Sequence, residues 1–363
     1  MSEYQYHEWQ AIDRILTSEE QAAVNELSSH IEVSTSRAVV TYNWSGFRHD
    51  PKQVLLKYFD AYFYLANWGS LRLMFRFPKG LLDEAEISPY CDGECVTFET
   101  IGKYHVLDLD FNPEDGGGWL EVEAGLGYFI HLRAGVLEGD YRLLYLAWLK
   151  TMTIYGDRYE IGDYEEDDQG FASNDLEPPL PPGLKKLSPP LQNFIQVFEI
   201  DPFLVRAAAE ASPDPRNDLE MDYCDLINRL TRAECDDFLR RLAEGDPGVG
   251  LSLRKRLGAF LPQEHAQSAN RRSIQQLLQR AKQLEKDEKK LQTRAAHRKH
   301  IAEMKALAAR EAQVWHEVET LLANGRKIAS VYDEATEKLE KLKQLSEFQD
   351  TRDIFTMNLL QLS

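Results

Sequence analysis

The stretch from Ser273 to Ala323 constrains the fold most, because about fifty consecutive residues contain neither proline nor glycine. They are mostly Leu, Gln, Lys, Glu, Arg and Ala, which lose little rotamer freedom in a helix. Asn324-Gly325 follows, and both residues tolerate the left-handed conformation that ends many helices. The sequence therefore predicts a single helix of roughly 75–80 Å, at about 1.5 Å per residue.

Apolar residues recur along this predicted helix at alternating spacings of three and four, a pattern typical of a coiled-coil seam. The seam comprises Ile274, Leu277, Ala281, Leu284, Leu291 and Ala295 and then, after a slip in phase, Ile301, Met304, Ala308, Trp315, Val318 and Leu322. A second helix follows Gly325, with an apolar stripe of Ile328, Val331, Tyr332, Ala335, Leu339, Leu342 and Leu345. Because the turn is short, we expect an antiparallel helical hairpin, or coiled-coil arm, over residues 270–363.

The charges are distributed unevenly along the chain, whose net charge is −18. Residues 1–250 hold 21 Lys and Arg against 45 Asp and Glu, whereas residues 251–310 hold 15 against 5. The basic segment indicates either a surface that follows nucleic-acid phosphates or a helix face that docks on the chain's own acidic body. The candidate nucleic-acid-binding residues are Arg271, Arg272, Arg280, Lys282, Lys289, Lys290, Arg294, Arg298 and Lys299.

Residues 1–156 carry strand and helix signals in alternation, which predict an α+β domain with a helix-backed, mostly antiparallel sheet. We expect strands at residues 4–12, 33–42 and 71–77, and a hairpin of residues 96–100 and 104–111 that turns at Gly102. A capping box at residues 17–20 predicts a helix to about His30. Asp50-Pro51 predicts the start of another helix, whose aromatic stripe continues to Ala66. A last helix is expected over residues 141–155.

Residues 157–187 are expected to be a linker, because they contain an acidic run at 163–168 and a proline-rich run at 178–182. Residues 188–265 predict a small all-α domain. Ser188-Pro189 and Asp201-Pro202 each supply a cap and a first-turn proline, and residues 231–234 form another capping box.

Four carboxylates with a repeated spacing are candidate ligands of a metal-dependent hydrolase. Asp108 and Asp110 lie two apart on a predicted strand and therefore face the same way, and Glu121 and Glu123 repeat that spacing. Such oxygen ligands suit Mg²⁺ or Mn²⁺. The alternative is that they form the polar outer face of a hairpin, and no Lys lies two residues after either Glu, as a common nuclease pattern requires.

Cys91 and Cys95, with His105 following, are a second candidate metal site. A zinc knuckle needs another ligand pair, which Cys224 and Cys235 do not supply at their spacing, so two thiols flanking a turn are the alternative. The chain contains no complete catalytic motif, and its glycine run at 116–118 lacks the Lys and Ser/Thr of a phosphate loop. The sequence therefore favours a protein without a cofactor and without enzymatic activity.

The composition points to a cytoplasmic protein. Four cysteines in 363 residues are typical of a reducing compartment. No apolar run approaches the roughly 20 residues of a membrane-spanning helix, and the N-terminus is polar and carries no export signal. We therefore expect no membrane association.

Several stretches resemble a family of bacterial hypothetical proteins that has no assigned activity. They are residues 1–6, Ala11–Arg14, Ala66–Gly69 with Arg72–Met74, and Leu176–Leu184. Val331–Ala335 with Leu339 and Leu342 is also similar to helical segments near the ends of bacterial SWIM zinc-finger proteins. The Cys-x-Cys and Cys-x-His motif of those proteins is absent here, so this resemblance implies a helical interaction module alone.

Three functions follow from these features. The leading hypothesis is a non-enzymatic interaction or adaptor protein, whose coiled-coil arm binds a protein partner or a second copy. Its candidate contact residues are Leu277, Leu284, Leu291, Ile301, Trp315, Leu339 and Leu342. The second is a nucleic-acid-associated subunit of a bacterial defence or DNA-processing system, and the third is the metal-dependent hydrolase.

Overall fold

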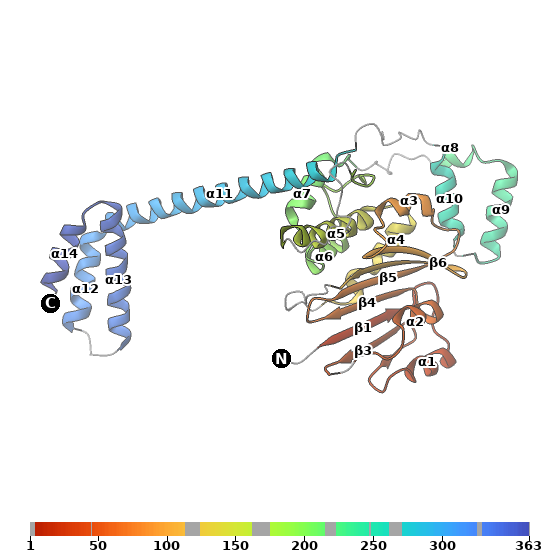
Figure 1. Cartoon of the computed structure of the whole chain (residues 1–363), viewed down its shortest axis with the longest axis horizontal. Coiled ribbons are helices and arrows are strands. Elements are labelled where there is room, and N and C mark those ends of the chain that lie inside the picture. The colour runs from red at the N-terminus through yellow and green to blue at the C-terminus, as the bar shows by residue number, and fades with distance from the viewer. Residues whose placement is uncertain are drawn as a thin grey trace. The chain divides into compact units, whose positions relative to one another are not determined.

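The computed structural model describes residues 4–44, 46–112, 124–161, 175–214, 223–246, 248–260, 271–324 and 329–362. For residues 155–161, 324, 329 and 330 it describes the backbone only. The chain divides into two compact units, Met1–Lys282 and Gln283–Ser363. The predicted class is confirmed: an antiparallel sheet with helices precedes a helical C-terminal region (Figure 1).

A seven-stranded antiparallel sheet forms the centre of the first unit, in the order β2-β3-β1-β4-β5-β7-β6. Its strands are β1 (Gln5–Gln10), β2 (Glu32–Val33), β3 (Arg37–Tyr42), β4 (Ala61–Ala66), β5 (Leu71–Pro78), β6 (Val96–Ile101) and β7 (Tyr104–Phe111). β6 and β7 form the predicted hairpin, in which Ile101 pairs with Tyr104. Gly102 turns the chain there with φ +60°, a conformation that glycine adopts without strain.

Helices flank the sheet and continue to the end of the chain. In the first unit they are α1 (Ser18–Asn25), α2 (Pro51–Tyr58), α3 (Glu84–Ile87), α4 (Ile130–Leu137), α5 (Arg142–Ile161), α6 (Pro189–Val197), α7 (Pro202–Ala211), α8 (Tyr223–Ile227), α9 (Arg232–Ala243) and α10 (Val249–Gly258), with short 3₁₀ turns at Ser88–Tyr90 and Leu126–Tyr128. α11 (Ile274–Ala308) begins in this unit, and the second unit contains α12 (Glu311–Asn324), α13 (Ala329–Phe348) and α14 (Arg352–Gln361).

The sheet is packed on both faces, which explains why its central strands are apolar on both sides. On one face, Trp9, Tyr62 and Met74 join buried residues of α1 and α2 in one cluster. On the other face, Phe63 packs against Phe129 and Phe198 with ring centroids 5.1 and 6.5 Å apart. Both cores lie within the first unit, so that unit buries enough apolar surface to fold as a layered α+β domain.

The prediction of one helix from Pro51 to Ala66 is wrong. α2 ends at Tyr58, and Ala61–Ala66 is the strand β4. The apolar run here is buried on both faces of the sheet, and such a run has no period that separates helix from strand. Asp60 interrupts the helix because its side chain accepts hydrogen bonds from the backbone N–H groups of Ile12 and Asp13, at 2.7 and 3.0 Å.

Four predicted helix starts are confirmed. The side chains of Asp50 and Asp201 accept backbone hydrogen bonds at the N-caps of α2 and α7, each followed by proline. Thr17 and Thr231 form capping boxes for α1 and α9 with a glutamate three residues later. These starts were predictable because each cap joins residues that are at most three apart.

The acidic run at 163–168 lies outside the described residues. The proline-rich part of the predicted linker packs on the first unit. The carbonyl oxygens of Pro179 and Pro181 accept hydrogen bonds from Tyr90 and Ser212, both at 2.8 Å. Beyond it, α6 and α7 both contact α5.

The prediction of a single helix over Ser273–Ala323 is also wrong. The chain forms two helices here, α11 and α12, which are separated at Ala309-Arg310. Neither proline nor glycine causes this break. The bend instead brings Met304 and Leu307 against Leu345 of α13 in a buried cluster. The free energy of that packing outweighs the helix propensity of the two residues at the break.

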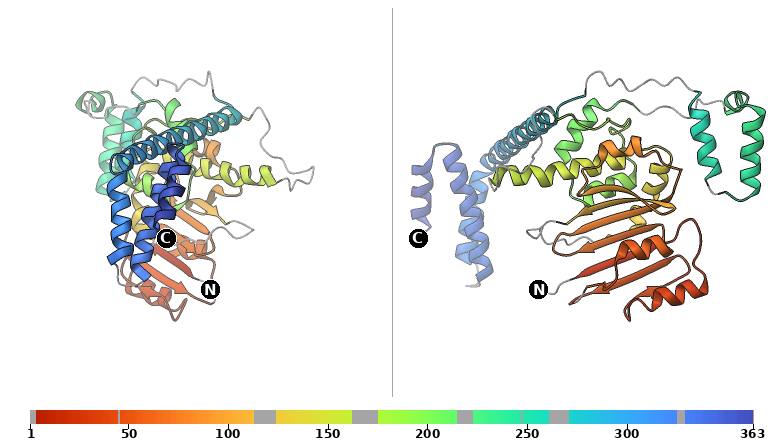
Figure 2. Two further views of the ribbon diagram at one scale, coloured as in Figure 1. Left: turned by 90° about the vertical axis from the view of Figure 1, so that its left-hand side faces the viewer. Right: turned by 45° about the vertical axis from the view of Figure 1, so that its right-hand side comes forward.

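The second unit ends in three helices that lie side by side (Figure 2). α12 and α13 form the predicted antiparallel pair, although it is shorter than the expected arm, and Lys338 of α13 bonds Glu317 of α12 at 2.7 Å. α14 was not predicted as a separate helix. Of the predicted stripe on α13, Ala335, Leu342 and Leu345 are buried.

Among the helices in the described part of the chain, none has the length and apolarity that crossing a membrane requires.

Candidate functional site

The candidate carboxylates Asp108 and Asp110 lie on β7, on the sheet face that α2 covers. Arg72 of β5 donates to both oxygens of Asp108 through Nε and Nη2, at 2.9 and 2.7 Å. Lys52, near the start of α2, lies 2.9 Å from the same carboxylate. Asp108 is therefore a buried anion that already accepts from two cations, and its side chain is only 5% exposed.

Asp110 has a different environment, although the same arginine reaches it at 3.2 Å. Burial raises the pKa of Asp110, and the neighbouring charge of Asp108 acts in the same direction. Burial alone would also raise the pKa of Asp108, but the hydrogen bonds and charges of Arg72 and Lys52 outweigh it and lower that pKa. The pair thus combines one carboxylate held ionised with one that is protonated more easily.

The other two predicted ligands, Glu121 and Glu123, lie outside the described residues. A metal ion at Asp108 would have to displace Lys52 or Arg72 from its oxygens. The geometry therefore supports an ion-paired cluster that joins β5, β7 and α2. The metal-dependent hydrolase stays a prediction. Lys52 and Arg72 occupy the oxygens of Asp108 that a metal ion would need.

Replacing Asp108 tests the structural role. We expect Asp108→Asn to lower the free energy of unfolding by about 2–3 kcal/mol, because two partly buried cations lose their shared anion. Urea unfolding at pH 7 measures the change, with Glu99→Gln as the control, since the side chain of Glu99 is 49% exposed. A stable variant that has lost a bound divalent ion, as shown by metal analysis, would instead establish a metal ligand.

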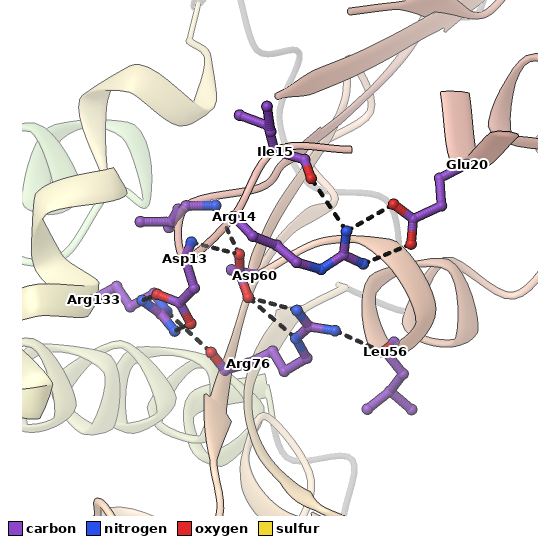
Figure 3. A network of polar contacts seen from close by, with 9 residues as sticks. Asp13, Arg14, Ile15, Glu20, Leu56, Asp60, Arg76 and Arg133 are labelled. Atoms are coloured by element: carbon purple, nitrogen blue, oxygen red, sulfur yellow. Dashed lines mark hydrogen bonds and ion pairs between the residues drawn. The ribbon is translucent and has the colours of Figure 1, made fainter. Parts of the chain in front are cut away.

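A second polar cluster, which no pattern in the sequence predicted, joins the end of β1 to β5 and α4 (Figure 3). Asp60 pairs with Arg76 at 2.6 Å, and both side chains are at most 5% exposed. Arg133 of α4 donates to both oxygens of Asp13, at 2.9 and 2.7 Å, and to the carbonyl oxygen of Arg76 at 3.0 Å. Arg14 extends the cluster to Glu20 at the surface.

We interpret this cluster, called the Asp60–Arg133 cluster, as stabilising the fold, because each of its charged side chains is paired with one of opposite charge. Arg133 and Asp13 also line a cavity of about 260 Å³ that reaches Gly248 and Arg254. The ion pairs join residues as much as 120 positions apart. No local pattern in a single sequence marks such contacts, so the cluster was not predictable.

A third feature is His7 on β1, which is 5% exposed and enclosed by aromatic rings. The rings within 6.2 Å of its centroid are those of Trp9, Tyr42, Phe47, Tyr62 and Tyr64. Its Nδ1 forms a 2.9 Å hydrogen bond with the hydroxyl of Tyr62, whereas Nε2 is buried and has no partner among the described residues. Burial lowers the pKa of His7 to about 4, so the ring is neutral at pH 7.

The opposite face of β1 contributes to a cavity of about 520 Å³. Its lining residues are Glu8, Gln10, Arg37, Gly125, Gly127, Tyr128 and Asn193. Glu8 is 3% exposed and accepts hydrogen bonds from the Leu126 N–H at 2.7 Å and the Tyr6 hydroxyl at 2.8 Å. Arg37 donates to the other carboxylate oxygen of Glu8, so both oxygens accept hydrogen bonds. The bond to the Leu126 N–H attaches the turn at Leu126–Tyr128 to β1. Burial and the adjacent Glu8 raise the pKa of Tyr6 to about 12.

The predicted cysteine site is not assembled in the described residues, which contain no group of three His, Cys, Asp or Glu placed to hold a metal ion. Cys91 lies 3.7 Å from the Ile87 carbonyl oxygen, and burial raises the pKa of its thiol to about 11. His105 instead bonds Thr100 at 2.9 Å and stacks on Phe98. These contacts agree with the alternative, in which the thiols flank a turn.

Seven of the nine candidate nucleic-acid-binding cations fall into two groups, and the other two, Arg271 and Lys282, are exposed residues of the first unit. Arg272 is held by the buried Glu177 at 3.0 Å, and Arg280 pairs with Glu210 at 2.7 Å. These two cations therefore contribute to the first unit. In contrast, Lys289, Lys290, Arg294, Arg298 and Lys299 are all exposed on α11.

The candidate partner-binding residues are also divided between interior and surface. Leu277 and Leu342 are almost fully buried within the chain, so they are not available to a partner. Leu284, Ile301 and Leu339 are partly buried, and Leu291 is 64% exposed. Trp315 packs against Phe355 of α14 at 5.6 Å.

Comparison of the chain with protein-family models, with curated proteins and with solved structures gave no match in any of the three.

Proposed function

We propose that the protein is a non-enzymatic interaction protein that associates with a second copy of itself through α14. One observation carries the proposal. Ile354, Met357 and Leu360 follow one another at intervals of three on this helix and are 50, 58 and 69% exposed. Residues at this spacing share one side of a helix. α14 therefore presents an apolar stripe that is largely exposed to solvent.

The local packing holds α14 in a defined position within the second unit. Asp350 adopts a positive φ of 57°, and the Thr351 N–H donates to the Ser346 carbonyl oxygen at 2.8 Å, which turns the chain back from α13. Phe355 covers Trp315 from the other side of α14. The inner side of the helix is thus attached to the bundle, while the stripe faces away from it.

A second copy suits this surface because of its charge. After Asp353, the sequence from Ile354 to Gln361 contains no charged residue, although the chain as a whole carries −18. Two such helices can meet about a two-fold axis without burying charges or opposing like charges. A different protein would need an apolar face of the same kind.

Light scattering after size exclusion tests the proposal on the full chain. We expect wild type to show at least the mass of a dimer at about 50 µM, whereas Met357→Glu with Leu360→Glu gives the monomer mass, because each glutamate must lose water at the interface. Circular dichroism should show unchanged helix content, since neither side chain is buried within the chain.

The matched control adds two glutamates away from the stripe, at Thr336 and Gln349, which are both exposed. This variant should keep the mass of wild type. A monomeric wild type, or a stripe variant that still associates, contradicts the proposal.

A further inference from the structure

The middle of α11 is exposed and strongly basic, and it is separate from the apolar stripe of α14. Residues 289–300 contain five Lys and Arg, two His and no Asp or Glu. All twelve are exposed, and a ring contact is described at one end of the run, where the His300 and Phe348 centroids lie 6.4 Å apart. A run of twelve residues covers more than three helical turns and a length of about 18 Å.

Four of the cations in this region recur at intervals of four, namely Lys286, Lys290, Arg294 and Arg298. Side chains four apart are neighbours on a helix, and like charges at this spacing destabilise it. Within the row, Lys290 pairs with Asp287 at 3.4 Å, whereas Arg294 and Arg298 have no ion pair among the described residues. Beside the row, Lys289 pairs with Glu285 at 2.6 Å and Lys299 with Glu303 at 3.9 Å. The helix thus keeps a row of cations whose mutual repulsion an external polyanion would relieve.

We infer that this segment of α11 binds the phosphate backbone of duplex DNA. About 18 Å of duplex carries roughly ten phosphate charges, so several lie within reach of the row. The major groove of B-form DNA, about 12 Å wide, admits a bare helix. Lys289 and Lys299 lie on other sides of α11 than the row, so a helix in the groove has cations toward both strands.

The same features disfavour other nucleic acids. Single-strand binding relies on aromatic side chains that stack on bases. The sequence from Lys286 to His300 contains no Phe, Tyr or Trp. The major groove of A-form RNA is too deep and narrow for protein side chains to read. Duplex DNA is therefore the polyanion that fits this helix.

Fluorescence anisotropy with a labelled 24-base-pair duplex and the full-length protein tests the inference. About five phosphate contacts predict that affinity falls a few hundred-fold between 50 and 200 mM salt. Arg294→Gln with Arg298→Gln should weaken binding about tenfold or more at 100 mM salt and reduce the salt slope by about two. Removing these side chains leaves helix α11 intact, because neither makes a contact that the fold requires.

The control removes two exposed cations from the same unit, in Lys343→Gln with Arg352→Gln, and therefore changes the net charge equally. It should bind as wild type does. Equal binding by the Arg294 and Arg298 variant, or no binding of the duplex at 50 mM salt, overturns the inference. Tighter binding of single-stranded DNA, duplex RNA or polyglutamate also overturns it, and polyglutamate would point to an acidic protein segment.

Discussion

Replacing Arg76 with methionine should lower the free energy of unfolding by about 3–5 kcal/mol, because the buried Asp60 would lose its counter-charge. Asp60 is 1% exposed, and Arg76 donates to it through Nε and Nη2 at 3.3 and 2.6 Å. The same guanidinium donates to the Leu56 carbonyl oxygen at 2.7 Å and lies 4.3 Å above the Tyr104 ring. One substitution therefore removes an ion pair, a carbonyl partner and a cation–π contact.

Replacing Asp60 with asparagine should lower the free energy of unfolding by a similar amount, but for a different reason. Asp60 accepts the N–H groups of Ile12 and Asp13 in addition to Arg76. Burial raises its pKa, but these hydrogen bonds and the arginine outweigh burial, so the net pKa is lowered. The carboxylate is thus ionised at neutral pH and fixes the chain between β1 and α1.

A double-mutant cycle measures the coupling. Asp60→Asn with Arg76→Met removes both charges of the pair, so its cost should be smaller than the sum of the two single variants by about 1–3 kcal/mol. Urea unfolding of all four proteins at pH 7 gives the values. Additive costs would show that the two groups act independently and would contradict the role assigned to the pair.

The second large effect is expected from His7 when the pH is lowered. The pKa of His7 is about 4 in the folded chain, because of burial, and about 6.5 in an unfolded one. The unfolded chain therefore binds a proton first as the pH falls. Stability from this group is complete above pH 6.5 and decreases as the pH falls toward 4, by up to about 3 kcal/mol.

The variant His7→Phe separates this contribution from that of the carboxylates, because phenylalanine fits an aromatic environment and does not titrate. The difference in unfolding free energy between wild type and variant should change by about 2–3 kcal/mol in favour of the variant between pH 7 and pH 4.5. The exposed His131 provides the control, His131→Phe. A difference that is constant with pH would show that His7 titrates equally in the folded and unfolded states.

The two proposed binding surfaces, on α14 and α11, do not include the residues that we expect to stabilise the fold. The α14 stripe and the α11 row are exposed, and their variants should leave the fold intact. The clusters at Asp60, Asp108 and His7 are buried, and their variants should lower stability. Measuring stability and binding on each variant therefore distinguishes structural from functional residues.

Features that depend on residues close together in the chain could be predicted from the amino-acid sequence. The caps at Thr17, Asp50, Asp201 and Thr231 were predictable, because each is a contact between residues within one helical turn. The β6–β7 hairpin was predictable from its alternating strands and from Gly102. The helical character of residues 274–324 and the excess of cations on α11 also follow directly from composition and spacing.

Features that join residues far apart in the chain could not be predicted and became visible in the folded protein. Ala61–Ala66 is a strand because Asp60 binds the end of β1 and because both faces of the run are covered. α11 ends at Ala308 because Met304 and Leu307 pack on Leu345. The partners of Asp108 and the exposure of α14 likewise depend on packing between elements. The physical reason is that backbone caps and periodicity are short-range, whereas burial and ion pairing are settled by whichever surfaces the folded chain brings together.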